Sequence, residues 1–293
     1  MSKEKKKLLI LGATGMAGHV VYTYLNETSK YDIATVCHSG KMGTKSYQLD
    51  VYDTQLLESI IVKEKPDYVI NCIGILIKGS RNNPANAIYI NAYFPHLLSQ
   101  IVSTNLPSSR VYHISTDCVF SGKKGNYSDT DVKDALDTYG MSKNLGELIN
   151  DRDLTLRTSI IGPELKEKGE GLMHWVFSQR TVGSLNGYEK SIWGGVTTLE
   201  LAKVIDACID SDITGLYQIS NNIGIKKYDL VSLIVDEFKL PIKVNAVDGV
   251  ICDKTILNSQ REDFFFKISS YEKMISDMHI FMDLHKDMYK QYY

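Results

Sequence analysis

The sequence has few scattered cysteines, no long apolar run and almost no net charge. Its five cysteines contain no Cys-X-X-Cys pair, which argues against a zinc site or a disulfide framework and predicts a reducing, cytoplasmic location. No apolar run reaches the roughly 18–20 residues of a membrane span. A formal net charge of −2 offers no electrostatic basis for binding nucleic acid or an anionic membrane. No metal site is predicted.

The length and composition are those of a large globular protein. The 293 residues can bury a sizeable core, and apolar strands alternate with amphipathic helices without an internal repeat. This pattern predicts an α/β fold with a doubly wound parallel sheet of the Rossmann type. The pattern changes after Ile161, so we expect a first domain over residues 1–161 and mainly a smaller α/β substrate lobe over 162–293. A segment at about 196–222 is expected to complete the sheet.

The N-terminal segment KKLLILGATGMAGHVVYTYL runs from an apolar strand through Gly12, Gly15 and Gly18 into a helix. Glycines there allow a tight turn and let the backbone approach a pyrophosphate, while the helix N-terminus offers free N–H groups. A glycine-rich turn can be purely structural. Its position between a first strand and a first helix favours dinucleotide binding, so the domain over residues 1–161 is expected to bind NAD(P).

The end of the second strand bears on the choice of cofactor. NAD-selective folds place an Asp or Glu there to bind the ribose 2′-hydroxyl. This chain has Cys37, His38, Ser39 and Lys41 instead, with no carboxylate to repel a 2′-phosphate. We therefore expect NADPH, with NADH as the alternative. A solvated turn that ignores the 2′ position would give dual use.

The stretch STDCVFSGKKGNYSDTDVKDALDTYGMSK holds the predicted chemistry. Thr116 follows an apolar strand, and Tyr139 and Lys143 are spaced i, i+4 at the start of a predicted helix. The ammonium is expected to lower the phenol pKa and so provide a general acid or base. The Thr116 hydroxyl can hydrogen-bond a substrate carbonyl oxygen. The alternative is a solvated helix face with a Tyr anchored at its edge.

Two further features concern the crevice and the lobe. Asn91 is polar within a predicted long helix, NPANAIYINAYFPHLLSQIVS, where it either kinks the helix or forms hydrogen bonds near the site. Trp175, Asn186 and Trp193 are predicted to line a substrate cleft between the lobes. The alternative places both tryptophans in the core and Asn186 in a turn.

Taken together, GATGMAG, STDCVFSGKKGNYSDTD, YGMSKNLGE and LRTSIIGP resemble extended short-chain dehydrogenases/reductases, most closely the dTDP-4-dehydrorhamnose reductase branch of nucleotide-sugar enzymes. The resemblance is specific over about residues 8–165. It implies that NAD(P)H reduces the 4-keto group of a nucleotide-linked 6-deoxy sugar for cell-surface polysaccharide synthesis. Thr116 would be the active-site hydroxyl and Tyr139 the acid. Lys143 would be the partner of Tyr139 and would also hold the nicotinamide ribose.

The resemblance also implies a set of binding residues. Those expected at the pyrophosphate are Gly12, Thr14, Gly15, Met16, Ala17 and Gly18. Those expected at the adenine and near the nicotinamide ribose are Asp50, Val51, Cys72, Ile73 and Gly74. Val119 and Phe120 would lie beside the sugar.

Departures from the family pattern leave the substrate open. Cys118 replaces the Tyr of STDYVF, and IGIL replaces a polar segment after the third strand. The sugar is therefore either dTDP-4-dehydrorhamnose or a UDP-2-acetamido-2,6-dideoxy-4-hexulose. The alternatives in function are a non-catalytic NADP-binding regulatory subunit on the same fold and a sugar-nucleotide epimerase. Homodimer formation is also left open.

Overall fold

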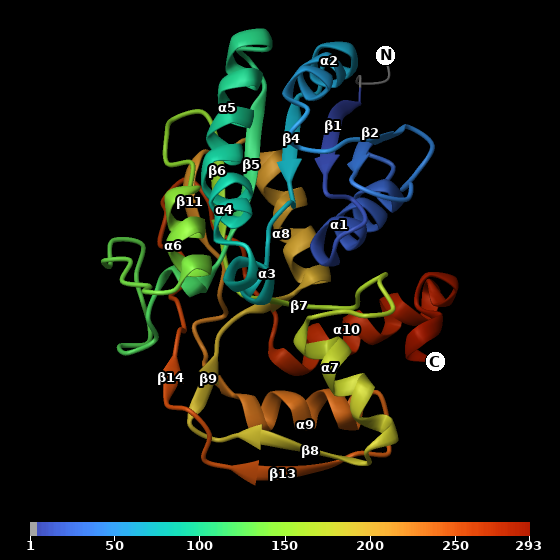
Figure 1. Cartoon of the computed structure of the whole chain (residues 1–293), viewed down its shortest axis with the longest axis vertical. Helices are drawn as coiled ribbons and strands as arrows, with labels where there is room; N and C mark the ends of the chain where they lie inside the picture. The colour runs from blue at the N-terminus through green and yellow to red at the C-terminus, as the bar shows by residue number, and fades with distance from the viewer. Residues whose placement is uncertain (1–4) are drawn as a thin grey trace.

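The computed structural model describes residues 5–293 and is built on one parallel sheet (Figure 1). Its seven strands lie in the order β11-β6-β5-β4-β1-β2-β3, and every neighbouring pair is parallel. The strands are β1 (Lys6–Leu11), β2 (Tyr31–Cys37), β3 (Ser46–Gln48), β4 (Tyr68–Asn71), β5 (Arg110–Ser115), β6 (Leu154–Arg157) and β11 (Gly215–Gln218). The predicted doubly wound α/β class is confirmed.

Helices cover both faces of this sheet. They are α1 (Met16–Glu27), α2 (Thr54–Glu64), α3 (Ile77–Asn82), α4 (Pro84–Ala87), α5 (Phe94–Asn105), α6 (Thr138–Leu145) and α8 (Thr198–Ser211). Strand β1 shows why two layers are needed. Leu8 and Ile10 pack in one buried cluster with α1 and α8, whereas Leu9 and Leu11 pack in another with α2 and α5. Because side chains alternate along a strand, a run such as LLIL can be buried only between two helical layers.

A smaller part of the chain lies beyond the carboxyl ends of the strands. In Figure 1 the arrowheads of β1 and β4 point toward it. Its helices are α7 (Leu172–Ser178), α9 (Lys227–Glu237) and α10 (Tyr271–Leu284). Its strands form pairs and a triplet, namely β7 (Ile160–Ile161) with β10 (Val196–Thr197), β8 (Ser184–Tyr188) with β13 (Lys243–Val247), and β9 (Ser191–Trp193) between β12 (Ile225–Lys226) and β14 (Cys252–Asp253). The domain boundary proposed at residues 161/162 stays a prediction.

Around Asn91 the predicted long helix changes from α-helical to π-helical turns. Helices α4 and α5 are separated by a π-helical segment, Ile88–Tyr93, with Asn91 fully buried inside it. Such a segment is a common way to insert a polar side chain at a functional position. The chain stays helical from Pro84 to Asn105, so the predicted long helix is present, but its turns around Asn91 are π-helical rather than α-helical.

No helix within residues 5–293 combines the length and the apolar character that crossing a bilayer would require.

His19 on α1 anchors the C-terminal segment to the sheet domain. The ring is fully buried, with Nδ1 2.7 Å from the Gly15 carbonyl oxygen and Nε2 2.9 Å from the Tyr289 hydroxyl. Burial lowers the pKa of His19 to about 4. The folded protein therefore prefers the neutral ring, whereas the unfolded chain takes up a proton near the ordinary pKa of about 6.5.

We expect His19 to make stability depend on pH. Its contribution is complete above about pH 6.5 and is lost as the pH falls toward 4, by at most about 1.4 kcal/mol per pH unit. Urea unfolding at several pH values should show a steeper loss of stability on acidification in the wild type than in His19→Phe, which cannot titrate there. Equal slopes for the two proteins would contradict this.

Candidate active site

The predicted catalytic and cofactor residues lie around the ends of four neighbouring strands. Leu11, Cys37, Asn71 and Ser115 are the last residues of β1, β2, β4 and β5, which are adjacent in the sheet. The helix after β1 packs on one face and α5, after β4, on the other, and we call this switch point at the strand ends the crevice. In parallel α/β sheets this switch point is where ligands bind.

The glycine-rich turn is built for close approach. Gly15 N–H donates to the Gly12 carbonyl oxygen over 2.9 Å, and Gly15 is the N-cap of α1. A Cβ on Gly18 would lie 2.2 Å from the Gly12 oxygen, so only glycine lets the helix meet the turn there. The first N–H groups of a helix have no acceptor within it. This cradle, which side chains would fill, fits the pyrophosphate of a dinucleotide.

The remaining predicted cofactor residues surround this turn. The Thr14 hydroxyl donates to the Ser39 carbonyl oxygen over 3.3 Å, which joins the turn to the loop after β2. His38, Ser39 and Lys41 are exposed on that loop, and Asp50 and Gly74 are exposed at neighbouring strand ends. Three further predicted cofactor residues are partly buried, namely Val51, Cys72 and Ile73. Exposed His38, Ser39 and Lys41 are free to meet a ligand beside Thr14.

Thr116 and Tyr139 are brought together from different elements. Thr116 caps a short 3₁₀ turn, Asp117–Val119, and accepts the Cys118 N–H over 3.2 Å. Tyr139 lies in the first turn of α6, which packs so closely on the Asp117–Val119 turn that a Cβ on Gly140 would lie 2.2 Å from the Cys118 carbonyl oxygen. Desolvation raises the pKa of Tyr139 and nearby Cys118 adds to the rise, whereas the Thr116 hydroxyl lowers it. The phenol is thus protonated at neutral pH.

The predicted effect of Lys143 on this phenol was wrong. Both residues lie on α6, but the Lys143 side chain is buried and its Nζ turns toward β5. It donates to the Ile114 carbonyl oxygen over 2.7 Å and lies 3.3 Å from His113 Nε2. Burial lowers the pKa of Lys143 to about 8. The helical spacing set a shared face but not the direction of a long, flexible side chain.

A buried ion pair holds α6 against the sheet. The Glu147 carboxylate, just after α6, accepts Arg157 Nε over 2.8 Å and Nη2 over 2.7 Å. It also accepts the Ser115 hydroxyl over 2.8 Å, while Arg157 Nη1 donates to Gln218 Oε1 over 2.7 Å. Arg157 is fully buried. One network therefore joins α6, β5, β6 and β11 behind the site.

Asn91 clamps the other side of α6. Its Oδ1 accepts the Ile75 N–H over 2.8 Å, and its Nδ2 donates to the Ile75 carbonyl oxygen over 3.0 Å. The same Nδ2 donates to the Ser142 hydroxyl over 3.2 Å. Of the two alternatives drawn from the sequence, these bonds show the second, in which Asn91 is hydrogen-bonded near the proposed site.

The predicted substrate residues are not assembled into one cleft. Val119 and Phe120 have no exposed surface, and the Phe120 ring is stacked on Tyr127 with 4.2 Å between ring centroids. Trp193 is also buried, with its indole N–H donating to the Ser159 hydroxyl over 2.9 Å, as expected of a core tryptophan.

The other two are exposed on separate elements. Trp175 lies on α7, with 40% of its surface exposed, and Asn186 lies on β8. Among residues 5–293 no hydrogen bond or ring contact joins any two of Trp175, Asn186 and Trp193. The substrate role of all five residues therefore stays a prediction. The burial of Val119, Phe120 and Trp193 does not support it.

Sequence patterns missed a strap that crosses the site. Residues 252–257 run beside the loop after Thr116, with Asp253 N–H donating to the Gly122 oxygen and Tyr127 N–H to the Thr255 oxygen, each over 2.8 Å. The strap places Lys254 close enough to stabilise the charge of Asp117, whose pKa burial raises. No local motif marks Lys254. The only signal was its position in an aperiodic stretch that tertiary contacts organise.

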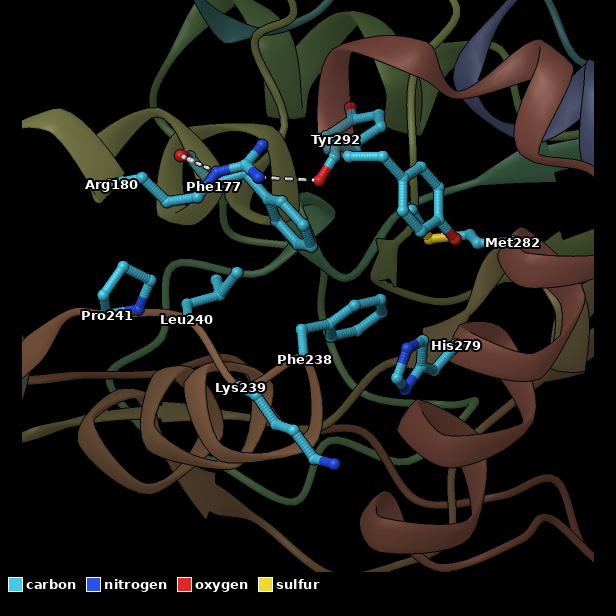
Figure 2. A pocket seen from close by; sticks show the side chains of 10 residues that line it. Phe177, Arg180, Phe238, Lys239, Leu240, Pro241, His279, Met282 and Tyr292 are labelled. Carbon is cyan, nitrogen blue, oxygen red and sulfur yellow. Dashed lines mark hydrogen bonds between the residues drawn. The ribbon is translucent and has the colours of Figure 1, made fainter.

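A separate pocket of about 250 Å³ lies in the smaller part of the chain (Figure 2). Phe177, Phe238 and His279 point into it, and the Arg180 guanidinium at its edge donates to the Tyr292 carbonyl oxygen over 2.8 Å. None of the predicted catalytic, cofactor or substrate residues lines it. The cavity therefore plays no part in the crevice at the strand ends.

Comparison with known proteins agrees with this geometry. The family model described as the RmlD substrate binding domain matches residues 6–252. The chain belongs to this family. It is an extended short-chain dehydrogenase/reductase of the RmlD-like, nucleotide-sugar reductase type.

Two relatives and one structure illustrate the range. A dTDP-4-dehydrorhamnose reductase of Aggregatibacter actinomycetemcomitans is 26% identical, over 79% of each chain. A methionine adenosyltransferase 2 subunit beta of Xenopus tropicalis is 23% identical, over 80% of this chain and 73% of that protein. The crystal structure of dTDP-4-dehydrorhamnose reductase from Bacillus anthracis in complex with NADP has a TM-score of 0.80 at 20% identity, covering 94% of this chain and 99% of the other. The structural likeness shows the shared fold.

Contact with the strap is expected to require glycine at position 125. Gly125 has φ +72°, and a Cβ there would lie 2.3 Å from Asp253 Oδ2. Gly183 has a similar φ of +77° but open space around it. Gly183→Ala should cost about 1 kcal/mol from backbone strain alone, and Gly125→Ala about 2–4 kcal/mol because the clash adds to the strain. Urea unfolding measures both. Equal losses would show that the strap does not press on this loop.

Proposed function

We propose that the protein uses NAD(P)H to reduce the 4-keto group of a nucleotide-linked 6-deoxy sugar, a precursor of cell-surface polysaccharide. The observation that carries the proposal is the close packing of the first turn of α6, which bears Tyr139, on the short turn that Thr116 caps at the end of β5. The candidate sugars are dTDP-4-dehydrorhamnose and a UDP-2-acetamido-2,6-dideoxy-4-hexulose. Membership of the RmlD family supports the reaction class.

The residues divide the work by position. The turn from Gly12 to Gly15 and the α1 N-terminus would hold the cofactor pyrophosphate, and the bound nicotinamide would supply hydride. The Thr116 hydroxyl would hydrogen-bond the substrate carbonyl oxygen. Tyr139 would donate its proton to that oxygen. Its raised pKa suits an acid, since an alkoxide is more basic than a phenolate. Lys143 would hold the nicotinamide ribose.

NADPH is the proposed cofactor, with NADH as the alternative. Exposed His38, Ser39 and Lys41 beside Thr14 support it, because a 2′-phosphate there would meet hydrogen-bond donors and positive charge. No acidic side chain lies on the chain between Cys37 and Ser46 to repel it.

A regulatory subunit is the second candidate, because several of the curated relatives are methionine adenosyltransferase 2 beta subunits. Such a protein would bind cofactor and a partner chain without turnover, since the fold does not determine the activity. Co-purification with a partner, together with no carbonyl-dependent oxidation of NADPH, would favour this candidate over the reductase.

We expect NADPH oxidation at 340 nm with a 4-keto-6-deoxy sugar made in situ from dTDP-glucose or from UDP-GlcNAc. Tyr139→Phe should lose at least about 100-fold in kcat because the proton donor is gone, while NADPH affinity stays near wild type. Tyr93→Phe, which removes a hydroxyl from an exposed Tyr, is the control and should keep full activity. Turnover of Tyr139→Phe within a few-fold of wild type would show that Tyr139 is not the acid.

The cofactor preference has its own test. Ser39→Asp should weaken NADPH binding at least about tenfold while NADH binding changes little, because the new carboxylate repels only the 2′-phosphate. Thr44→Asp adds the same charge farther along the exposed loop and should have a much smaller effect. Fluorescence titration with both nucleotides measures this. Equal weakening by the two variants would place the 2′-phosphate elsewhere.

A further inference from the structure

Behind Lys143 lies a buried chain of polar groups that the proposed reaction does not use. His113 on β5 is fully buried and sits in register opposite Asn71 on β4. Its Nδ1 is 3.1 Å from Asn71 Nδ2, and its Nε2 is 3.3 Å from Lys143 Nζ. At the far end, Asn71 Oδ1 accepts the backbone N–H of Ile73 over 3.1 Å. Ile73 is one of the predicted cofactor residues.

Hydrogen-bond chemistry determines which nitrogen of His113 carries the proton. The Ile73 N–H can only donate, so the Asn71 atom facing it is the amide oxygen. The Asn71 NH₂ group therefore faces His113 and donates to Nδ1. A neutral imidazole has one donor and one acceptor, so Nε2 carries the hydrogen. That N–H points at Lys143 Nζ.

The two protonation states of Lys143 respond differently to this N–H. An ammonium group has three donors and no acceptor, so it cannot accept the His113 N–H and two donors face each other. A neutral amine has a lone pair that accepts it. The second partner of Nζ, the Ile114 carbonyl oxygen at 2.7 Å, is satisfied by either state. The His113 contact thus favours the neutral amine.

We propose that His113 is a positioning residue that shifts the protonation equilibrium of Lys143 toward the neutral amine in the ligand-free protein. Through the chain from Ile73, Asn71 and His113, the loop after β4 controls the protonation of a lysine proposed to hold the cofactor. The consequence for turnover rests on the proposed function, whereas the protonation of Lys143 does not.

The surrounding charges are consistent with such control. Burial lowers the pKa of Lys143 to about 8, while Glu147 and Cys72 act in the opposite direction. Glu147 is largely occupied by Arg157, its buried partner. Burial also holds the pKa of His113 well below its ordinary value, and the charges of Lys143 and of His96 on α5 add to this. His113 therefore stays neutral, and Lys143 titrates near physiological pH.

The first measurement is the tautomer of His113 in the wild-type chain. Long-range ¹H–¹⁵N spectra of the ¹⁵N-histidine-labelled protein should show a protonated Nε2 and an unprotonated Nδ1, with the resonances assigned by their loss in His113→Phe and by their shift in Asn71→Ser. An Nδ1-protonated ring would overturn the proposal. This readout requires neither a substrate nor turnover, and it stands even if His113→Phe fails to fold.

The second measurement is the titration of Lys143, followed by its ¹³Cε shift and assigned with Lys143→Met. His113→Phe should raise the midpoint by about one pH unit, because the N–H that favours the neutral amine is gone. A shift of that size corresponds to the free energy of about one hydrogen bond. His96→Gln is the matched control. It removes a neighbouring histidine that bonds the Leu145 oxygen instead, and it should move the midpoint far less. An unchanged or lower midpoint in His113→Phe, or an equal shift in His96→Gln, would overturn the proposal.

Where turnover is found, the pH profile adds a functional readout. If Lys143 acts as an ammonium, the alkaline fall in kcat/KM should move to higher pH in His113→Phe by the same amount as the NMR midpoint. A profile that stays in place while the NMR midpoint moves would leave the His113 effect intact and refute the role of the Lys143 charge in the proposed function.

Discussion

The buried bond between Glu147 and Arg157 is the contact on which the site depends. Arg157, the last residue of β6, has no exposed surface and pairs with Glu147 just after α6. Ser115 and Gln218 complete the network. Removing one partner of such a pair leaves a buried charge uncompensated, which typically costs about 3–5 kcal/mol. The network fixes α6 relative to the end of β5, and that relation sets the first turn of α6, with Tyr139, against the turn that Thr116 caps.

Burial, more than pairing, sets the acid–base properties here. Desolvation raises the pKa of Tyr139 and lowers that of Lys143, so each group is driven toward its neutral form. A neutral phenol is a ready proton donor, and a lysine that titrates near pH 8 is sensitive to one neighbouring N–H. The two residues are linked through their shared helix and crevice rather than by a direct charge effect. This arrangement gives His113 its influence.

Long-range contacts complete the crevice with residues from the other end of the chain. The strap at 252–257 pairs with the loop after Thr116 and places Lys254 beside Asp117. The C-terminal segment reaches back to α1, where Tyr289 bonds His19 one turn after the glycine-rich loop. The smaller part of the chain is thereby tied to both the proposed cofactor turn and the proposed reaction centre.

The sequence by itself determined the doubly wound sheet and the glycine-rich turn, because these follow from local periodicity and from glycine's lack of a Cβ. Only the tertiary structure decided the rest. The direction of the Lys143 ammonium, the burial of Val119, Phe120 and Trp193, and the arrival of Lys254 all depend on contacts between distant segments. Periodicity assigns a residue to a face, but packing against another element decides what that face meets.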